Sequence, residues 1–329
     1  MKPGRVIGLL GLALLFLTAQ GCSSNPKFFA KDPDSIRIIG SQGTGPGQFN
    51  EPFAIGVDPK GKIYVADARN HRIQLFDPNG NFLLQWGSQG NEEGNFERPS
   101  GIVIDASGHV FISDYELDRI QKFSSQGTFL AQWGLSGKRP GEFNSPGGLA
   151  LDSEGFLYVA DIYNHRIQKF DTDGNFLKAW GNHQPISLMR SFFNFLFNPG
   201  AAGNFNYPSR ITVGPEDTVY VSDSYNNRVQ AFSTDGEFRM QFGGAGVWGG
   251  SFRVASGIAT DPRGNLYVAD FYNHRIQVFD KQGRFITKLG KFGTEPGQFD
   301  GPTDLAFSPL GTVIVVDWGN HRLQSIPVK

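Results

Sequence analysis

Acidic and basic side chains recur together along this chain at one fixed spacing. An Asp is followed five residues later by an Arg at Asp67/Arg72, Asp114/Arg119, Asp161/Arg166, Asp223/Arg228, Asp270/Arg275 and Asp317/Arg322. A carboxylate and a guanidinium can pair with each other or bind neighbouring carbonyl groups. Because every copy shares the pattern, we expect it to stabilise the fold and not to carry chemistry.

Two further charged residues stand where the other copies have small ones. One position in each copy reads Ala54, Gly101, Gly148, Arg210, Gly257 and Asp304. Arg210 and Asp304 break the pattern, so they are our polar candidates for contact with a ligand. The alternative is an ion pair, either between these two residues or with local partners.

Aromatic residues form a third candidate group. Shortly after five of the six Asp residues the chain carries Tyr115, Tyr163, Tyr225, Phe271, Tyr272 and Trp318. Aromatic side chains in loops on a rigid scaffold suit contact with a protein, a peptide or a glycan. Tyr163, Tyr225, Tyr272 and Trp318 are our candidates for that contact, and packing between neighbouring loops is the alternative.

The elements that carry these residues come from a repeat. The Asp–Arg segments recur at intervals of 47, 47, 62, 47 and 47 residues, and periods of this size are typical of propellers or solenoids. One full unit, residues 94–140, contains the apolar runs GIVID, VFISD, RIQKF and FLAQWG, with Gly-containing turns after the first and third. Four such runs predict one antiparallel blade, and six units predict an all-β, six-bladed β-propeller.

The two ends of the repeat region complete each other. The sixth unit has three runs (TDLAF, TVIVVD and RLQSI), and a match to the missing fourth, SIRIIGSQG, precedes the first unit. We therefore predict that the N-terminal strand joins the last blade and closes a ring over residues 36–329, since closure removes exposed sheet edges. A solenoid would instead need atypical capping repeats at its ends.

The long third interval marks an insertion. Its 15-residue excess falls within residues 182–203 and includes Phe192 and Phe193. Insertions in repeat proteins map to one face, often the binding face, so these two residues are further candidates for partner contact. The segment would serve as a lid on the channel, a docking element, a membrane-touching patch or a plug on the propeller's own surface.

Residues 1–22 have the order of a secretory signal. Lys2 and Arg5 precede an apolar stretch at 6–19, and Cys22, the single cysteine, follows it. A spanning helix needs about 20 residues, so a permanent membrane helix is the weaker interpretation. The arrangement resembles the lipobox of bacterial lipoproteins, with Ala19 where such boxes usually carry Leu.

That resemblance implies lipidation of Cys22, a polar tether over residues 23–35 and a membrane anchor in the bacterial cell envelope. Ser23 favours the outer membrane in the same sorting pattern. The alternative is an ordinary cleaved signal with an incidental cysteine.

The repeat unit itself resembles the NHL repeat, named for an Asn-His-Leu-like tripeptide. Asn70-His71, Asn164-His165, Asn273-His274 and Asn320-His321 stand at the position of that motif. The resemblance implies the propeller fold but no single function, because such domains include protein- and RNA-binding modules, a peptide-amidating lyase and bacterial envelope proteins. The histidines of the lyase would fall at Phe53, Ser100, Gly147, Ser209, Ser256 and Thr303, so that activity is not expected.

Metal chemistry has little support in the sequence. The four repeated histidines are spread round the ring, so they cannot all lie about 2 Å from one zinc ion. Six-bladed relatives include calcium-dependent lactonases, whose sites need several carboxylates or amides, and Asp304 is the one clear candidate. We expect no cofactor, with calcium as the alternative.

Composition narrows the class of partner. The formal net charge is −1 and no basic run occurs, so a nucleic-acid partner is not expected. We expect a monomeric, non-enzymatic, envelope-anchored scaffold that binds a protein, peptide or glycan through its loop face, the face with the second-to-third strand loops. The competing hypothesis is an exported metal-dependent lyase or lactonase-like hydrolase with its site at the central channel.

Overall fold

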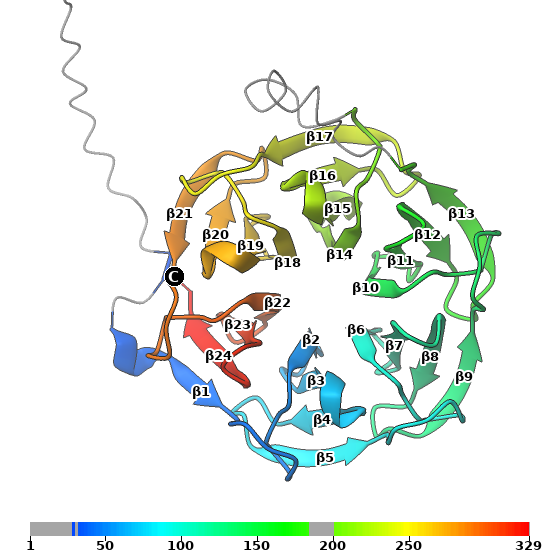
Figure 1. The fold of residues 1–329 in the computed structure, drawn as a ribbon, viewed down its shortest axis with the longest axis horizontal. Coiled ribbons are helices and arrows are strands. Elements are labelled where there is room, and N and C mark those ends of the chain that lie inside the picture. The colour runs from blue at the N-terminus through cyan, green and yellow to red at the C-terminus, as the bar shows by residue number, and fades with distance from the viewer. Residues whose placement is uncertain (1–27, 30–31, 184–200, 329) are drawn as a thin grey trace, which may run out of the picture.

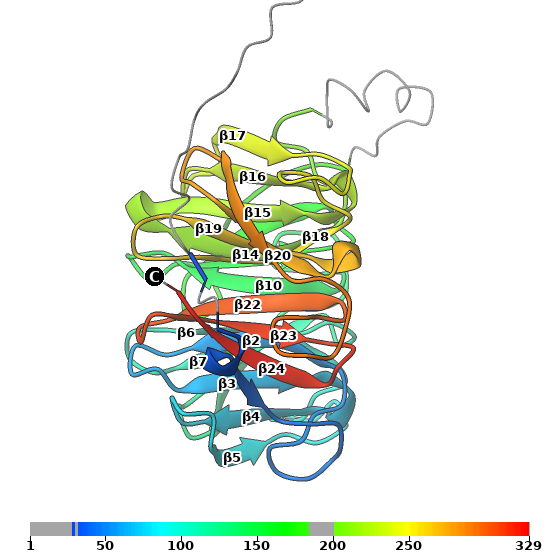
Figure 2. The ribbon, with the colours of Figure 1, turned by 90° about the vertical axis from the view of Figure 1, so that its left-hand side faces the viewer.

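The computed structural model describes residues 28–29, 32–183 and 201–328, and these form a ring of six four-stranded antiparallel sheets (Figure 1). Figure 2 shows the same ring from the side. The predicted six-bladed β-propeller is confirmed. Cys22, Phe192 and Phe193 lie outside the described residues, so their predicted roles stay predictions.

Each blade has its first strand innermost, and in blades 1 to 5 the strands follow one another outwards in chain order (Figure 1). Blade 1 contains β2 (Pro52–Val57), β3 (Ile63–Asp67), β4 (Arg72–Phe76) and β5 (Phe82–Trp86). Blade 2 contains β6 (Pro99–Ile104), β7 (Val110–Asp114), β8 (Arg119–Phe123) and β9 (Phe129–Trp133). Blade 3 contains β10 (Pro146–Leu151), β11 (Leu157–Asp161), β12 (Arg166–Phe170) and β13 (Phe176–Trp180).

The second half of the ring repeats this order. Blade 4 contains β14 (Pro208–Gly214), β15 (Thr218–Asp223), β16 (Arg228–Phe232) and β17 (Phe238–Gly243). Blade 5 contains β18 (Ala255–Thr260), β19 (Leu266–Asp270), β20 (Arg275–Phe279) and β21 (Phe285–Leu289). Blade 6 contains β22 (Pro302–Ser308), β23 (Thr312–Asp317), β24 (Arg322–Pro327) and the N-terminal β1 (Arg37–Ile39).

Helical structure in the described part of the chain is limited to short 3-10 turns. They are η1 (Pro33–Ser35), η2 (Ala68–Asn70), η3 (Pro215–Asp217), η4 (Ser224–Asn226) and η5 (Phe271–Asn273). None of the helices among the described residues has the length and apolar character that crossing a bilayer requires.

Blade 6 closes the ring as predicted. β1 pairs antiparallel with β24, with Arg37 opposite Ser325 and Ile39 opposite Leu323. Phe29 forms an additional antiparallel bridge with Val328. Phe28 and Phe29 are buried in the core between blades 5 and 6, because their rings gain by leaving water. The tether expected over residues 23–35 stays a prediction.

The core lies between neighbouring blades. Every side chain of β3 is buried, as expected for a strand covered on both faces. A fully buried Phe precedes each blade, at Phe49, Phe96, Phe143, Phe205, Phe252 and Phe299. Phe143 packs on Phe170 with ring centres 5.6 Å apart. Gly134 (φ +100°) covers the same ring, and a Cβ there would lie 2.6 Å from it, so this turn requires glycine.

Candidate functional site

The repeated Asp–Arg pairs hold each loop-face hairpin to the connection that enters the blade. In blade 1, Arg72 Nε donates to Asp67 Oδ2 at 2.8 Å. The remaining guanidinium nitrogens of Arg72 donate to the carbonyl oxygens of Thr44, Gly45 and Gln48. The same direct ion pair occurs in blades 3, 4, 5 and 6 at 2.7 Å. The predicted structural role is confirmed for these five blades.

A Gln in the third strand completes this network. Gln74 Oε1 accepts from the Gly47 amide at 2.8 Å. Its Nε2 donates to the Gln48 carbonyl and to Asp67 Oδ2. The Gln therefore fixes the backbone just before the buried Phe49, and this explains why all six copies carry it.

Blade 2 departs from this arrangement. Leu117 replaces the Asn that donates to the repeated Asp in the other blades, as Asn70 does to Asp67. Asp114 instead accepts from the amides of Glu97 and Arg98. No direct Asp114–Arg119 ion pair forms among the described residues, and Arg119 Nε has no hydrogen-bond partner there.

The repeated histidines connect each blade to the next. Nδ1 of His165 accepts a hydrogen bond from the Tyr207 amide at 3.1 Å. In the same way, Nδ1 of His274 accepts from the Gly301 amide at 3.1 Å, and Nδ1 of His321 accepts from the Glu51 amide at 3.0 Å. Asp118 and Asn227 occupy the same position and their Oδ1 atoms accept from the next blade in the same way. In these five copies the position supplies a hydrogen-bond acceptor, which neutral His, Asn and Asp all provide. His71 differs, because its Nδ1 lies 2.6 Å from the Glu97 carbonyl oxygen and donates to it.

His165 is held in the neutral form that this contact needs. Burial lowers its pKa from 6.5 to about 4, and His183 adds to the effect. The centres of the two imidazole rings lie 3.9 Å apart, and their planes are inclined by 39°. Because this pKa lies well below neutral pH, Nδ1 of His165 is unprotonated there and accepts the Tyr207 amide proton.

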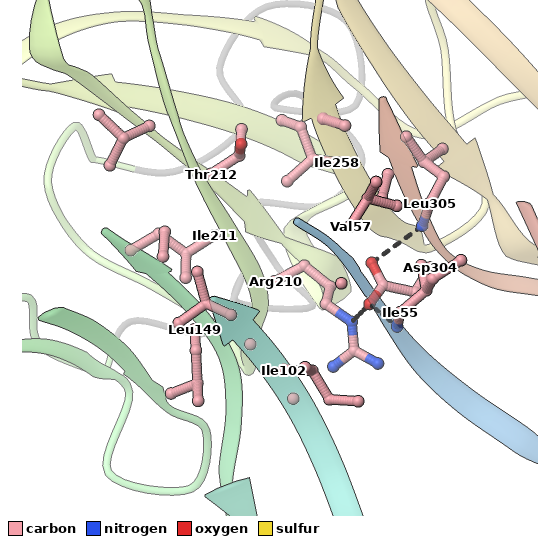
Figure 3. A pocket seen from close by; sticks show the side chains of 18 of the residues that line it. Ile55, Val57, Ile102, Leu149, Arg210, Ile211, Thr212, Ile258, Asp304 and Leu305 are labelled. Carbon is pink, nitrogen blue, oxygen red and sulfur yellow. Dashed lines mark hydrogen bonds and ion pairs between the residues drawn. The ribbon is translucent and has the colours of Figure 1, made fainter. Parts of the chain in front are cut away.

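Arg210 and Asp304 meet across the inside of the ring (Figure 3). Nε of Arg210, on β14, lies 3.3 Å from Oδ2 of Asp304, on β22, and both side chains are buried. Asp304 also accepts from the amides of Ile55 and Leu305. Arg210 Nη2 donates to the Phe53 carbonyl at 2.8 Å, so the pair joins blades 1, 4 and 6. The ion-pair alternative is what the structure shows, and ligand contact by these residues stays a prediction.

The environment of this pair disfavours both charges. Burial lowers the pKa of the Arg210 guanidinium and raises that of the Asp304 carboxyl, and the opposite charge offsets part of each shift. Beside the pair lies a channel cavity of about 260 Å³, lined by the pair itself and by Ile, Leu and Val side chains of the innermost strands (Figure 3). The neighbouring glycines are required for space, since a Cβ on Gly148 would lie 2.7 Å from Arg210 Cα.

A second cavity opens at the loop face, on the other side of this pair. We call it the aromatic cup. It has a volume of about 390 Å³ and is lined by Phe53, Tyr115, Ile162, Tyr163, Tyr207, Ser209, Ser224, Tyr225, Val254, Ser256, Phe271, Tyr272 and Thr303. All six blades contribute to it, so it exists only in the closed ring.

The rings in the cup wall contact one another and remain accessible. Ring centres lie 6.3 Å apart from Tyr115 to Tyr163, 5.1 Å from Tyr163 to Tyr207 and 5.0 Å from Tyr207 to Tyr225. Nevertheless Tyr163 is 46% exposed, Tyr225 61% and Tyr272 54%. Loop packing and partner contact, the two alternatives for these rings, are therefore compatible.

The predicted site residues fall into distinct places. Tyr163, Tyr225 and Tyr272 line the cup, Arg210 and Asp304 lie beneath it, and Trp318 packs on Phe271, with ring centres 6.0 Å apart. Two cup residues missed by our sequence reasoning are Phe53 and Tyr207, both near the start of an innermost strand. Tyr207 stands directly before Pro208, and Val254, at the same position of blade 5, also lines the cup.

Within the described residues, no group of three or more His, Cys, Asp or Glu side chains is arranged to hold a metal ion. Asp304, the one candidate for calcium, faces Arg210 instead. A guanidinium at 3.3 Å opposes the binding of a cation at the same oxygen.

Comparison with known proteins agrees with the repeat seen in the structure. The model of the NHL repeat matches residues 49–76, 143–170, 205–232, 252–279 and 299–325, which leaves blade 2 with its Leu117 unmatched. Protein lin-41 of Caenorhabditis elegans is 44% identical over 54 residues, or 16% of this chain and 4% of that protein. Human NHL repeat-containing protein 3 is 44% identical over 50 residues, 15% of this chain and 14% of that protein. The matches thus span a small part of these relatives.

Solved structures share the architecture. A Bacteroides thetaiotaomicron protein of unknown function superposes with a TM-score of 0.66 at 18% identity, covering 89% of this chain and 76% of its own. A streptogramin B lyase superposes with a TM-score of 0.62 at 13% identity, and the match covers 91% of this chain and 100% of the lyase. A gluconolactonase from Xanthomonas campestris superposes with a TM-score of 0.61 at 14% identity, and the match covers 86% of this chain and 88% of the gluconolactonase. Identities this low support the fold alone. The chain is thus a six-bladed β-propeller in which five of the six blades match the NHL repeat.

Proposed function

We propose that this propeller is a non-enzymatic binding module that holds a partner in the aromatic cup. The observation that carries the proposal is the cup itself, a concave site built by all six blades in which large rings remain exposed. Rigid aromatic side chains supply contact area at a low cost in conformational entropy, which suits recognition.

The charged residues support binding over catalysis. Arg210 and Asp304 satisfy each other below the cup, and the repeated Asp–Arg pairs are used within the blades. A general acid or base must reach the substrate, and the cup lining contains no carboxylate, imidazole or ammonium group among the described residues.

The test is ligand binding by a cup variant. Tyr163, Tyr225 and Tyr272 are changed together to Ser, and wild type and variant are compared by calorimetry against soluble envelope polysaccharides and a synthetic peptide library. We expect a ligand that binds the wild type and loses at least about tenfold in affinity with the variant. The matched control is Trp248→Ser, because Trp248 is 79% exposed but does not line the cup. Equal affinity of all three proteins for every ligand would refute the proposal.

The second candidate is an exported lyase or lactonase-like hydrolase, favoured by the fold of the lyase and gluconolactonase neighbours and by the channel cavity. Elemental analysis of the purified chain after dialysis separates the two. Calcium or zinc bound in stoichiometric amount, and lost in Asp304→Ala, would favour this candidate and direct the search to lactones.

We also propose that the ring is anchored in the bacterial cell envelope through Cys22. The apolar stretch before this single cysteine supports the proposal. Mass spectrometry of the protein from its native membrane would show acyl chains on Cys22, and Cys22→Ser would release the protein from the membrane fraction. An unmodified cysteine in a membrane-free protein would refute it.

A further inference from the structure

The chemistry of the cup lining narrows the class of ligand. The cup offers two kinds of surface, namely aromatic faces and hydroxyl groups. Five of its lining residues are Tyr and four are Ser or Thr. Hydroxyl groups both donate and accept hydrogen bonds, so such a lining suits a ligand that is itself rich in hydroxyls.

Several of these hydroxyls are available. Within the described residues, the hydroxyls of Tyr207, Tyr225 and Tyr272 make no hydrogen bond. Thr303, 2% exposed, also has an Oγ1 atom without a partner in the described part of the chain. Ser256 donates to the Thr303 carbonyl and keeps its capacity to accept.

The backbone of the cup, in contrast, is already used. The amides of Tyr163, Tyr225 and Tyr272 donate to the carbonyl oxygens of Asn144, Asn206 and Arg253. Extended peptides are recognised largely through main-chain hydrogen bonds to a free strand edge. The innermost strands reach the cup only with their second residues, such as Phe53, Ser209 and Ser256. That is too short a strand edge for an extended peptide, which would leave its own amides unpaired there.

The charges around the cup disfavour both anionic and cationic ligands. Within the described residues, no ionisable acid or base other than Tyr lines the cup. The nearby Arg98 and Arg210 already face Glu116 and Asp304, so a phosphate or carboxylate would have to compete with these carboxylates for a cation. An organic cation is also disfavoured, since two guanidiniums already lie against the Phe53 ring. Cζ of Arg210 is 4.8 Å and Cζ of Arg98 is 5.6 Å from the ring centre. The Phe53 ring is therefore occupied, and these two positive charges beside the cup repel a further cation.

We propose that the aromatic cup binds an uncharged oligosaccharide, with the apolar faces of its sugar rings on Tyr163, Tyr225 and Tyr272 and its hydroxyls on the free Tyr and Thr hydroxyls. This inference rests on the proposed binding function and specifies its ligand. Ring centres from Tyr115 to Tyr225 lie about 5 to 6 Å apart, and neighbouring rings are inclined by 67°, 84° and 55° to each other. Neighbouring rings along this wall therefore offer apolar surface in different orientations, which suits the differently oriented rings of an oligosaccharide.

The experiment titrates the full chain, in a detergent without a sugar headgroup, with neutral oligomers of glucose, mannose and N-acetylglucosamine. Oligogalacturonate is the acidic counterpart, and a synthetic peptide library is the alternative ligand. We expect saturable binding of at least one neutral oligosaccharide. Tyr225→Ser and Tyr272→Ser should each weaken it about tenfold, while Trp248→Ser leaves it unchanged.

The outcomes separate the two proposals. If only peptides bind and Tyr225→Ser abolishes that binding, the glycan inference is overturned and the binding function stands. If oligogalacturonate binds better than every neutral oligomer, the uncharged class is overturned. If no oligosaccharide or peptide distinguishes wild type from the Tyr variants, both proposals are overturned. Circular dichroism of each variant establishes that a loss is not due to unfolding.

Discussion

Nε of Arg210 in blade 4 lies 3.3 Å from Oδ2 of Asp304 in blade 6, so these two blades are joined through the middle of the ring although they are not neighbours. The pair separates the aromatic cup from the channel cavity, because residues on one side of it line the first and residues on the other side line the second.

Replacing one residue of this pair should lower the free energy of unfolding more than replacing both. Asp304→Asn leaves the Arg210 charge buried without a counter-charge, and we expect a loss of about 3–5 kcal/mol in the free energy of unfolding. The double variant Arg210→Leu/Asp304→Leu should lose less than Asp304→Asn alone. Urea denaturation measures both, and a double variant less stable than the single one would contradict the prediction.

The His165 contact should make stability depend on pH. Its pKa is about 4 in the folded protein against 6.5 for a free His, so the unfolded chain binds the proton more tightly. The contribution is fully present above about 6.5, falls as the pH decreases towards 4, and changes no further below that. Denaturation at a series of pH values tests this. His165→Asn, which copies the Asn227 found at the same position of the next blade, should flatten the dependence in this window.

The exception in blade 2 provides a matched test of the Asp–Arg pairs. Asp270→Asn removes the partner of the buried Arg275, 2.7 Å away, and we expect a cost of about 3–5 kcal/mol. Asp114→Asn should cost less, because Asp114 accepts from backbone amides and does not pair directly with Arg119. Equal losses of unfolding free energy would show that the ion pair is not what these residues contribute.

The small residues beside the channel should not tolerate enlargement. A Cβ on Gly257 would lie 2.5 Å from Asp304 Cα, so Gly257→Ala must displace the β22 backbone. We expect a loss of about 1–3 kcal/mol, as is usual for overpacking. Ala54, at the same position in blade 1, already accommodates a methyl group. Ala54→Gly is therefore the control, and a Gly257→Ala variant as stable as wild type would refute the steric argument.

The fold followed from the sequence because the same short-range signals occur in every copy. Gly134 and Phe143 illustrate this, since the turn and the buried ring that requires it lie within a few residues of each other. Ring closure by β1 was predictable for the same reason, as the missing fourth strand of the last unit has a counterpart at the start of the region.

The candidate site could be predicted from the sequence only in part, because each blade contributes different residues to it. Tyr163, Tyr225 and Tyr272 are visible in the repeated loops, but Phe53 and Tyr207 reach the cup through the geometry of the closed ring. The role of His165 was also hidden, since its partner Tyr207 belongs to the next blade. Arg210 and Asp304 were identified as exceptions, whereas their distance could come only from the structure.

The closure of the ring by a three-residue strand has a mechanical consequence. Among the strands that the structure describes, β1 is the one outer strand that no hairpin joins to its neighbour (Figure 1). Pulling on the N-terminal side therefore loads the Phe29–Val328 bridge first and then separates β1 from β24. The other outer strands are spared, because each continues its own blade through a hairpin. A ring held by its N-terminal segment would thus open first between β1 and β24 when it is pulled. Force spectroscopy should record this separation as a first step before the rest of the ring unfolds.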